Sequence, residues 1–249
     1  MSVARRPLEE RLEGAFGRAE PRHFEWQTAH PIVGREEAAL VQRAFLPLGE
    51  RVLDVGCAEG ATLFHLGDPY GAIGVDLFEP KLVFARSVVK NAIFMQGSIY
   101  ELPFPKGQFD HVIVRDVIHH LDEPERAITE LARVLSPDGR IDILEPCRNN
   151  PLILLHALVR REERGELRSN AHFLRWLLEP EFELTTIERY QPLPLHRLFF
   201  HPGLGKRALT PKGTASNVLG SIERALERVM PRPLWAYVHA RATLRPGTR

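Results

Sequence analysis

The sequence has little that would place the protein outside the cell or inside a membrane. Only two cysteines occur in 249 residues, Cys57 and Cys147, which is too few for a disulfide framework. No apolar run reaches the roughly 18 residues that a membrane-spanning helix needs. The first stretch, MSVARRPLEERLEG, lacks the apolar core of a signal peptide. We therefore expect a cytoplasmic protein without an integral membrane segment.

A strong excess of charge is also missing. The formal net charge is +1, which indicates no bulk polyanion as partner. The charge is uneven, because residues 206–249 carry nine Lys or Arg against two Glu, a net of +7. This region could favour an anionic acceptor or a membrane surface, but the alternating Glu and Arg of SIERALER favour a solvated helix face. No nucleic-acid module or D/N-P-P-Y/F motif is present, so we expect no nucleic-acid partner.

Short apolar runs alternate with helical patterns in the middle of the chain, which is typical of a parallel sheet covered on both faces. The predicted strands are RVLDV, GAIGVD, AIFMQG, FDHVIVRD and GRIDILEP, the last one after the turn SPDG. Helical patterns follow the first, second and fourth of them. Two late strands, EFELTTIERY and LWAYVHARATL, would add an antiparallel edge. Ahead of the sheet, RHFEWQTAHP reads as irregular and GREEAALVQRAFL as an amphipathic helix.

The loop after the first strand lacks two common phosphate-binding patterns. It reads Gly56-Cys57-Ala58-Glu59-Gly60, which is not the G-x-G-x-x-G of dinucleotide enzymes and has no Lys-Ser/Thr pair of a P-loop. Two acids, Asp54 and Glu59, stand there instead. Carboxylates repel phosphate and suit a cationic group such as an ammonium. The loop therefore favours a nucleoside cofactor that carries an amino acid.

The second strand ends in Asp76, whose carboxylate could accept hydrogen bonds from both ribose hydroxyls. NAD enzymes share this feature, and a lone Asp after a strand can also cap a helix. Only together with the acidic loop does Asp76 favour the cofactor interpretation.

The motifs VLDVGCAEG, GVDLFEPKLVFAR, GSIYELPF, FDHVIVRDVIHHL and LARVLSPDGRIDILEP resemble, in order and spacing, class I S-adenosylmethionine-dependent methyltransferases. The resemblance covers roughly residues 35 to 146. It is strongest to the small-molecule branch with quinone-biosynthesis C-methyltransferases and sugar O-methyltransferases. It implies a Rossmann-like α/β fold: a seven-stranded, mostly parallel sheet with an antiparallel last strand, helices on both faces and helical cap insertions.

The resemblance also implies which residues bind S-adenosylmethionine. Asp54, Gly56 and Gly60 would hold the methionine end, with Cys57 and Ala58 in the same loop. The remaining predicted contacts are Asp76 at the ribose, Leu77 on the adenine, Gly97, Ser98 and Ile99 at the adenine edge, and Arg115 beside the methionyl part. The family usually has Gly where Ala58 stands and often Asp where Ser98 stands. Both departures predict a modest loss of affinity.

For the acceptor side, the resemblance indicates His119 and His120 after the fourth strand and Glu145 at the end of the fifth. A His-His pair and an acid at these places serve the acceptor hydroxyl in the related sugar O-methyltransferases. His119 is the preferred base, although a structural role for either histidine, or a turn-capping role for Glu145, stays open. A metal held by these three residues is not expected, because adjacent histidines rarely direct both rings at one ion and no HxxxH or CxxC spacing occurs.

The acceptor pocket is less defined by the sequence. In the family it is built from the N-terminal segment, here residues 1–34, and from insertions in the domain of residues 35–249, here at about 147–180 and 191–230. Aromatic and histidine side chains in these segments could cover an apolar or aromatic acceptor: Phe24, Trp26, His30, His172, Phe173, Trp176, His196, Phe199, Phe200 and His201. For any one of these residues, a place in the ordinary core of a helical cap is the preferred interpretation.

The sequence thus predicts an S-adenosylmethionine-dependent methyltransferase of a small molecule, with O-methylation preferred. C-methylation of a quinone-like precursor is the alternative within the class. Two alternatives from other classes are an NAD-dependent oxidoreductase, which the acidic loop disfavours, and a cofactor-binding partner protein without activity, which Ala58 and Ser98 keep open. The acceptor and the oligomeric state are not predicted.

Overall fold

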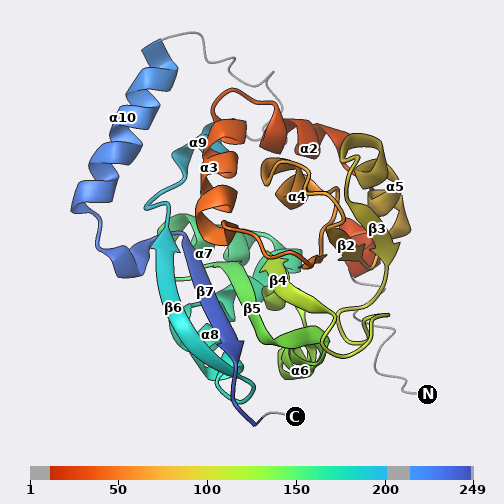
Figure 1. Cartoon of the computed structure of the whole chain (residues 1–249). Helices are drawn as coiled ribbons and strands as arrows, with labels where there is room; N and C mark the ends of the chain where they lie inside the picture. Colours follow the sequence, from red (N-terminus) through yellow and green to blue (C-terminus); the bar gives the residue numbers. More distant parts are fainter. Residues whose placement is uncertain (1–11, 201–213, 248–249) are drawn as a thin grey trace.

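The computed structural model describes residues 12–200 and 214–247. A sheet of seven strands runs through the molecule in the order β3-β2-β1-β4-β5-β7-β6 (Figure 1). The strands are β1 Val52–Val55, β2 Ile73–Asp76, β3 Ile93–Gln96, β4 Phe109–Arg115, β5 Leu135–Pro146, β6 Phe182–Tyr190 and β7 Tyr237–Leu244. Strands β1 to β5 pair in parallel, and β7 is antiparallel to both β5 and β6. The predicted Rossmann-like sheet is confirmed.

Helices cover both faces of this sheet. They are α2 Pro21–Thr28, α3 Val33–Phe45, α4 Ala61–His65, α5 Glu79–Val88, η1 Ile118–His120, α6 Pro124–Val134, α7 Pro151–Val159, η2 Arg161–Arg168, α8 Ala171–Leu178, α9 Leu195–Phe199, α10 Thr214–Val229 and η4 Arg232–Leu234. One buried cluster joins Leu40 of α3 and Leu82 of α5 to the sheet, and a second joins Leu131 of α6 and Leu177 of α8 to it. The central strands β1 and β4 are almost fully buried because both of their faces are covered, whereas the edge strands β3 and β6 are partly exposed.

Three predicted boundaries differ from the structure. RHFEWQTAHP was expected to be irregular, but most of it is helix α2, which begins with Pro21 in its first turn and buries Phe24 and Trp26. The run PLILLHALVRREERGEL, residues 151–167, has one continuous helical pattern in sequence but divides into α7 and the 3-10 helix η2. The turn SPDG lies inside β5, where Leu135 pairs with Phe109 and Arg140 pairs with His111, so these residues form a break in register.

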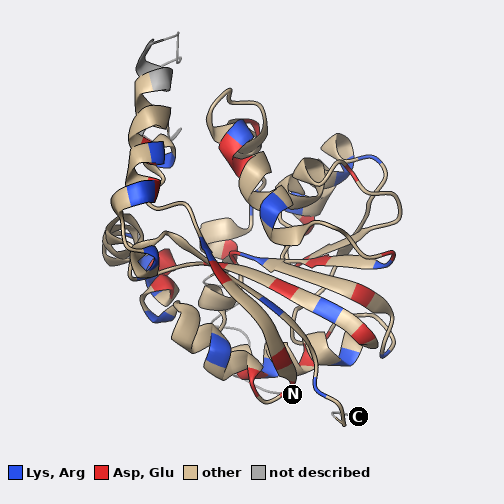
Figure 2. Cartoon of the chain, turned by 60° about the vertical axis from the view of Figure 1, so that its left-hand side comes forward, with Lys and Arg blue, Asp and Glu red and all other residues tan. Residues whose placement is uncertain are grey.

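The candidate site lies at the carboxyl ends of β1, β2 and β4. The strand order reverses between β1 and β4, and ligands of open α/β sheets bind at such a switch point. Among the described residues no helix has the length and apolarity to cross a membrane. Acidic and basic positions both occur along α10 (Figure 2). Arg241 of the basic C-terminal region donates to the buried Asp142 at 2.8 Å. The basic residues at 206, 207, 212 and 249 lie outside the described residues.

Candidate cofactor and acceptor site

The loop after β1 has a backbone that only small residues adopt readily. Gly56 and Gly60 have φ angles of 77° and 83°, in the left-handed region. A side chain at Gly56 would also collide with Val117, since a Cβ there would lie 2.3 Å from Cγ2. Ala58 is left-handed as well, with φ of 47°, which costs about 1–2 kcal/mol for a residue with a Cβ. A glycine, which the family resemblance implies at this position, would adopt this conformation without that cost.

Asp76 is fixed at the end of β2 by two backbone donors. Its carboxylate accepts the Ala58 N–H at 2.9 Å and the Phe78 N–H at 3.0 Å. Burial raises the pKa of Asp76, and these two hydrogen bonds oppose the rise. The loop and the following helix are therefore both tied to this carboxylate, which faces a cavity.

That cavity is bordered by most of the predicted cofactor residues. Its lining includes Gly56, Ala58, Asp76, Leu77, Gly97, Ser98 and Ile99. Four predicted contacts do not border it: Asp54, Cys57, Gly60 and Arg115. Sequence reasoning missed Leu12 and Phe16, which border the cavity from the N-terminal segment, and Tyr100. A lone Phe in a polar segment gave no signal before the fold was known.

Asp54 lies behind the loop and is almost completely buried. Within the described part of the chain, its Oδ2 atom has no hydrogen-bond partner. Burial raises the pKa of Asp54 to about 7, with Arg115 opposing and Asp76 adding to the rise. An unpaired buried carboxylate costs free energy unless a ligand supplies a donor. An ammonium group would be such a donor.

This cost leads to a prediction about pH. Because its pKa is near 7 in the folded state and normally 3.8, Asp54 binds a proton more tightly when folded, and stability falls as pH rises between these values. Asp54→Asn should raise the free energy of unfolding at pH 8 by on the order of 2 kcal/mol and leave it almost unchanged at pH 4. The same variant should bind S-adenosylhomocysteine more weakly. Denaturant unfolding at both pH values and calorimetry measure the two effects, and a variant less stable at pH 8 would contradict the assignment.

The interpretation of Glu59 as an acid open to a cationic ligand is wrong. Its carboxylate is buried, pairs with Lys81 Nζ at 2.9 Å and accepts the Glu20 N–H at 3.0 Å. Lys81, not Glu59, borders the cavity. The sequence put the two residues 22 positions apart, so their pairing was not visible before the fold placed α5 beside the loop.

Arg115 also has another role than the predicted contact with the methionyl part. It is buried and donates to Glu37 of α3 at 2.5 Å, and Glu37 also accepts Arg197 Nε at 2.7 Å. Burial opposes ionisation of Glu37, but the two guanidinium groups outweigh it and lower the Glu37 pKa to about 2. This buried network joins α3, β4 and α9 next to Asp54. Arg115 therefore connects β4 to α3 and does not border the cavity.

Glu145, at the end of β5, holds the turn that carries the two histidines. It is fully buried and accepts the N–H groups of Val117 at 2.8 Å, Ile118 at 2.9 Å and His119 at 3.2 Å. It also accepts His119 Nδ1 at 2.7 Å. All its oxygen sites thus serve η1, and Glu145 does not border the cavity. This geometry fits the turn-capping alternative and not an acid that contacts the acceptor.

His119 is poorly suited to be the base. Its ring is buried between Glu145 and Glu163 of η2, whose Oε2 lies 3.4 Å from His119 Nε2. Burial opposes the charge, but the two carboxylates outweigh it and raise the His119 pKa to about 10. A proton held this tightly is not exchanged with an acceptor near neutral pH. The preference for His119 over His120 is therefore revised.

His120 is the histidine that borders the cavity. Its ring centroid lies 4.8 Å from that of Phe16 and 3.9 Å from that of His119, and its Nε2 is 3.8 Å from Glu163 Oε2. His119, His120 and Glu163 bring ligand atoms within 4.8 Å of one another, a spacing that could hold a metal ion. His119 could offer only Nε2 to such an ion, because Glu145 engages its Nδ1 at 2.7 Å. Glu163 was missed from the sequence, where it is one acid in a charged run.

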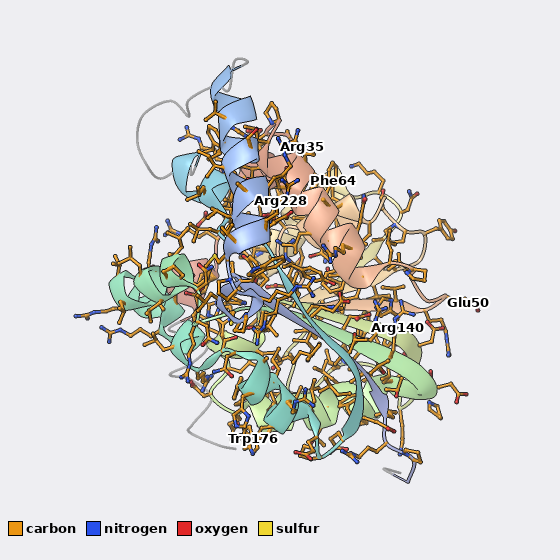
Figure 3. The ribbon with its side chains drawn as sticks, turned by 90° about the vertical axis from the view of Figure 1, so that its left-hand side faces the viewer. Arg35, Glu50, Phe64, Arg140, Trp176 and Arg228 are labelled. Atoms are coloured by element: carbon orange, nitrogen blue, oxygen red, sulfur yellow. The ribbon has the colours of Figure 1, made fainter. Side chains whose placement is uncertain are left out.

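The predicted aromatic cover separates into two places. The first place is around helices α2, α3 and α9, where four of the side chains lie: Phe24, Trp26, His30 and Phe200. Phe173 and Trp176 stack on each other on α8, which packs on β6, β7 and α6, and Trp176 lies far from Phe64 in Figure 3. His172 is exposed on the same helix, and His196 pairs with Glu223 of α10. The Phe199 side chain and His201 lie outside the described residues.

The cavity as a whole fits S-adenosylmethionine. It combines a carboxylate at the end of β2, apolar walls from Leu77 and Ile99, and a loop whose backbone leaves room at Gly56. The open oxygen of Asp54 lies behind that loop. The carboxylate of Asp76 suits a ribose and the apolar walls suit an adenine, whereas Asp54 does not border the cavity.

Comparison with known proteins agrees with this fit. Residues 53–143 match the family model described as a methyltransferase domain. An uncharacterized methyltransferase of Bacillus subtilis is 34% identical over 119 residues, which are 45% of this chain and 47% of that protein. Norajmaline N-methyltransferase of Rauvolfia serpentina is 28% identical over 67% of this chain and 63% of that enzyme. The chain thus spans about half to two thirds of the length of these curated relatives.

Solved structures extend the likeness to nearly the whole chain. Geranyl diphosphate methyltransferase, solved with geranyl diphosphate and sinefungin, superposes with a TM-score of 0.66 at 16% identity, covering 95% of this chain and 99% of that one. Sinefungin is an analogue of S-adenosylmethionine, which supports that molecule as the cofactor. The family match and the fold together identify residues 53–143 as the core of a class I S-adenosylmethionine-dependent methyltransferase domain.

Proposed function

We propose that the protein transfers a methyl group from S-adenosylmethionine to a small, largely apolar acceptor, with oxygen as the preferred methyl-accepting atom. The observation that carries this proposal is that Asp76, at the end of β2, and His120 of η1 border the same cavity. When bound, the cofactor supplies an electrophilic methyl group on a sulfonium. The acceptor's electron pair forms the new bond to carbon while the electrons of the carbon–sulfur bond remain on sulfur.

The chain's own part in this reaction is alignment and removal of one proton. Holding two reactants in line can supply on the order of 7–11 kcal/mol of the barrier. Asp76, Leu77 and Ile99 would fix the nucleoside, and the backbone at Gly56 would admit the methionine end. His120 would take the proton of an acceptor hydroxyl, and Glu163 would orient its ring from the other side.

An apolar acceptor suits the surroundings of His120. The cavity wall there is formed by Leu12, Phe16, Tyr100, Val117 and Leu121. Relatives act on norajmaline and on geranyl diphosphate, by their names, and both molecules have large apolar parts. The N-terminal segment, which supplies Leu12 and Phe16, would serve as the lid that excludes water.

The test is methyl transfer from S-adenosylmethionine labelled in its methyl group to a panel of phenols, isoprenoid alcohols and hydroquinones. We expect label in at least one apolar hydroxyl compound with the unchanged protein. Label in C-methylated quinone precursors alone would favour the C-methyltransferase alternative. No label in any compound, despite cofactor binding, would favour the inactive partner protein.

A second prediction concerns the effect of Asp76→Ala on cofactor binding. Loss of the ribose acceptor and of two loop hydrogen bonds should weaken S-adenosylhomocysteine binding by roughly 30-fold or more, which corresponds to about 2 kcal/mol. Calorimetric titration measures the change. Asp138→Ala, an exposed acid in the register break of β5, is the control and should bind like the unchanged protein. Equal affinity of the Asp76 variant would remove Asp76 from the cofactor site.

A further inference from the structure

Helix α7 exposes an apolar face to solvent. Four side chains on this nine-residue helix are 41–72% exposed, namely Leu154, Leu155, Leu158 and Val159. They follow the spacing i, i+1, i+4, i+5, which places them within one side of a helix. Among the described residues, fifteen large hydrophobic side chains are exposed, and four of these fifteen lie within six positions of α7. The pale green segment of α7 and η2 projects from the body in Figure 3.

The opposite side of α7 is firmly anchored. Ala157 is fully buried and Ile153 packs against the core cluster of the sheet. Asn150 caps the helix by accepting the N–H groups of Leu152 and Ile153, and its amide donates to the carbonyls of Pro192 and Leu234. The helix is therefore held in place by its inner face, and its outer apolar face needs a separate explanation.

Basic side chains border this apolar face. Arg160, Arg161 and Arg164 follow the helix and are exposed. Arg160 pairs with Glu162, but Arg161 and Arg164 make no ion pair within the described part of the chain. The other two acids of this run, Glu163 and Glu166, turn inward to His119 and His156. The outer side of the segment thus combines aliphatic side chains with a net positive edge.

The same segment reaches the acceptor end of the site. Gly165 of η2 packs so closely on His119 that a Cβ would lie 1.6 Å from its carbonyl oxygen. Arg168 of η2 donates to the carbonyl oxygens of His119 and Leu121, and Leu121 borders the cavity. Helix η2 therefore connects α7 to the turn that carries His120.

We propose that α7, with Arg161 and Arg164, docks on an anionic lipid surface, from which the enzyme takes an apolar acceptor. The acceptor part of this inference rests on the proposed function, and the docking part does not. Helices with an apolar face and a basic border lie in the interface of anionic membranes, held by apolar burial and by attraction to the headgroups. A nine-residue helix is too short to cross a bilayer, so α7 lies along its surface.

The experiment is flotation of the full chain with vesicles of phosphatidylcholine alone and of phosphatidylcholine with an equal part of phosphatidylglycerol. We expect binding to the mixed vesicles to exceed binding to the neutral ones by at least about 10-fold at low salt and to fall as salt is added. Leu155→Ser with Leu158→Ser should reduce binding to mixed vesicles about 10-fold or more. Arg161→Gln with Arg164→Gln should abolish the preference for the anionic lipid.

The control is Tyr70→Ser with Val83→Ser, two side chains that are 92% and 57% exposed and lie outside α7 and η2, before β2 and on α5. It should bind vesicles like the unchanged protein. All variants should keep their affinity for S-adenosylhomocysteine, which separates failed docking from misfolding and from failure of the proposed function. Absence of vesicle binding would overturn the proposal. So would a dimer in light scattering that the Leu155 and Leu158 changes convert to a monomer, because a second copy would then cover α7.

Discussion

Glu145→Ala is expected to lower the free energy of unfolding by about 3–5 kcal/mol, the usual cost of removing one partner of a buried ion pair. The change leaves the protonated ring of His119 without its carboxylate at 2.7 Å. It also leaves the N–H groups of Val117 and Ile118 buried without an acceptor. Each buried donor without a partner costs further free energy.

Urea unfolding at pH 7 measures this loss. Glu79→Ala is the control, because Glu79 makes a solvent-exposed pair with Arg86, and exposed pairs contribute little. The Glu79 variant should unfold almost like the unchanged protein. A Glu145 variant of unchanged stability would show that Glu145 does not hold the histidine turn, and would reopen its assignment as an acid at the acceptor.

The pH dependence of stability tests the same ion pair. The His119 pKa is 6.5 in an unfolded chain and about 10 in the folded protein. A raised pKa means that the folded state binds the proton more tightly, so this contribution is complete below about pH 6 and is lost as pH rises towards 10. The unchanged protein should therefore lose stability between pH 7 and 10. The Glu145→Ala variant should lose less over the same range.

His120→Ala is expected to lower the turnover of a hydroxyl acceptor by about 10²–10⁴-fold, the usual contribution of a positioned base. The affinity for S-adenosylhomocysteine should remain within about a factor of two, because His120 stands at the acceptor end of the cavity. Steady-state kinetics and calorimetry measure the two quantities. The pH profile of turnover should lose the limb that reports ionisation of the base.

His172→Ala, on the exposed side of α8, is the control and should turn over normally. Full activity of the His120 variant on a hydroxyl would contradict the assignment of the base. Full activity on a carbon acceptor would instead favour C-methylation, in which the cofactor and acceptor alone supply most of the driving force.

The fold could be predicted well because its signals are local. Apolar strands such as VIV in β4 alternate with amphipathic helices, and both periodicities can be read within a few residues. The cofactor loop was predictable for the same reason, since Gly56 and Asp76 each follow a strand directly. Helix α2 was not recognised, because its aromatic residues pack against the helices α3, α4 and α5 and not against the sheet.

The roles of charged residues could not be predicted from the sequence. Glu59, Arg115 and His119 stand in the expected positions, but their partners are Lys81, Glu37 and Glu163. These partners come from distant segments, and a buried charge takes its role from its partner. The sequence could name His119 and His120 as a pair, whereas only the structure shows which ring borders the cavity.

The most direct test of the account is calorimetric titration of the purified protein with S-adenosylhomocysteine, and separately with NADH. We expect micromolar binding of S-adenosylhomocysteine and no measurable binding of NADH, because the loop after β1 lacks the G-x-G-x-x-G pattern that lets a pyrophosphate approach the backbone. Binding of NADH without S-adenosylhomocysteine would contradict the central claim.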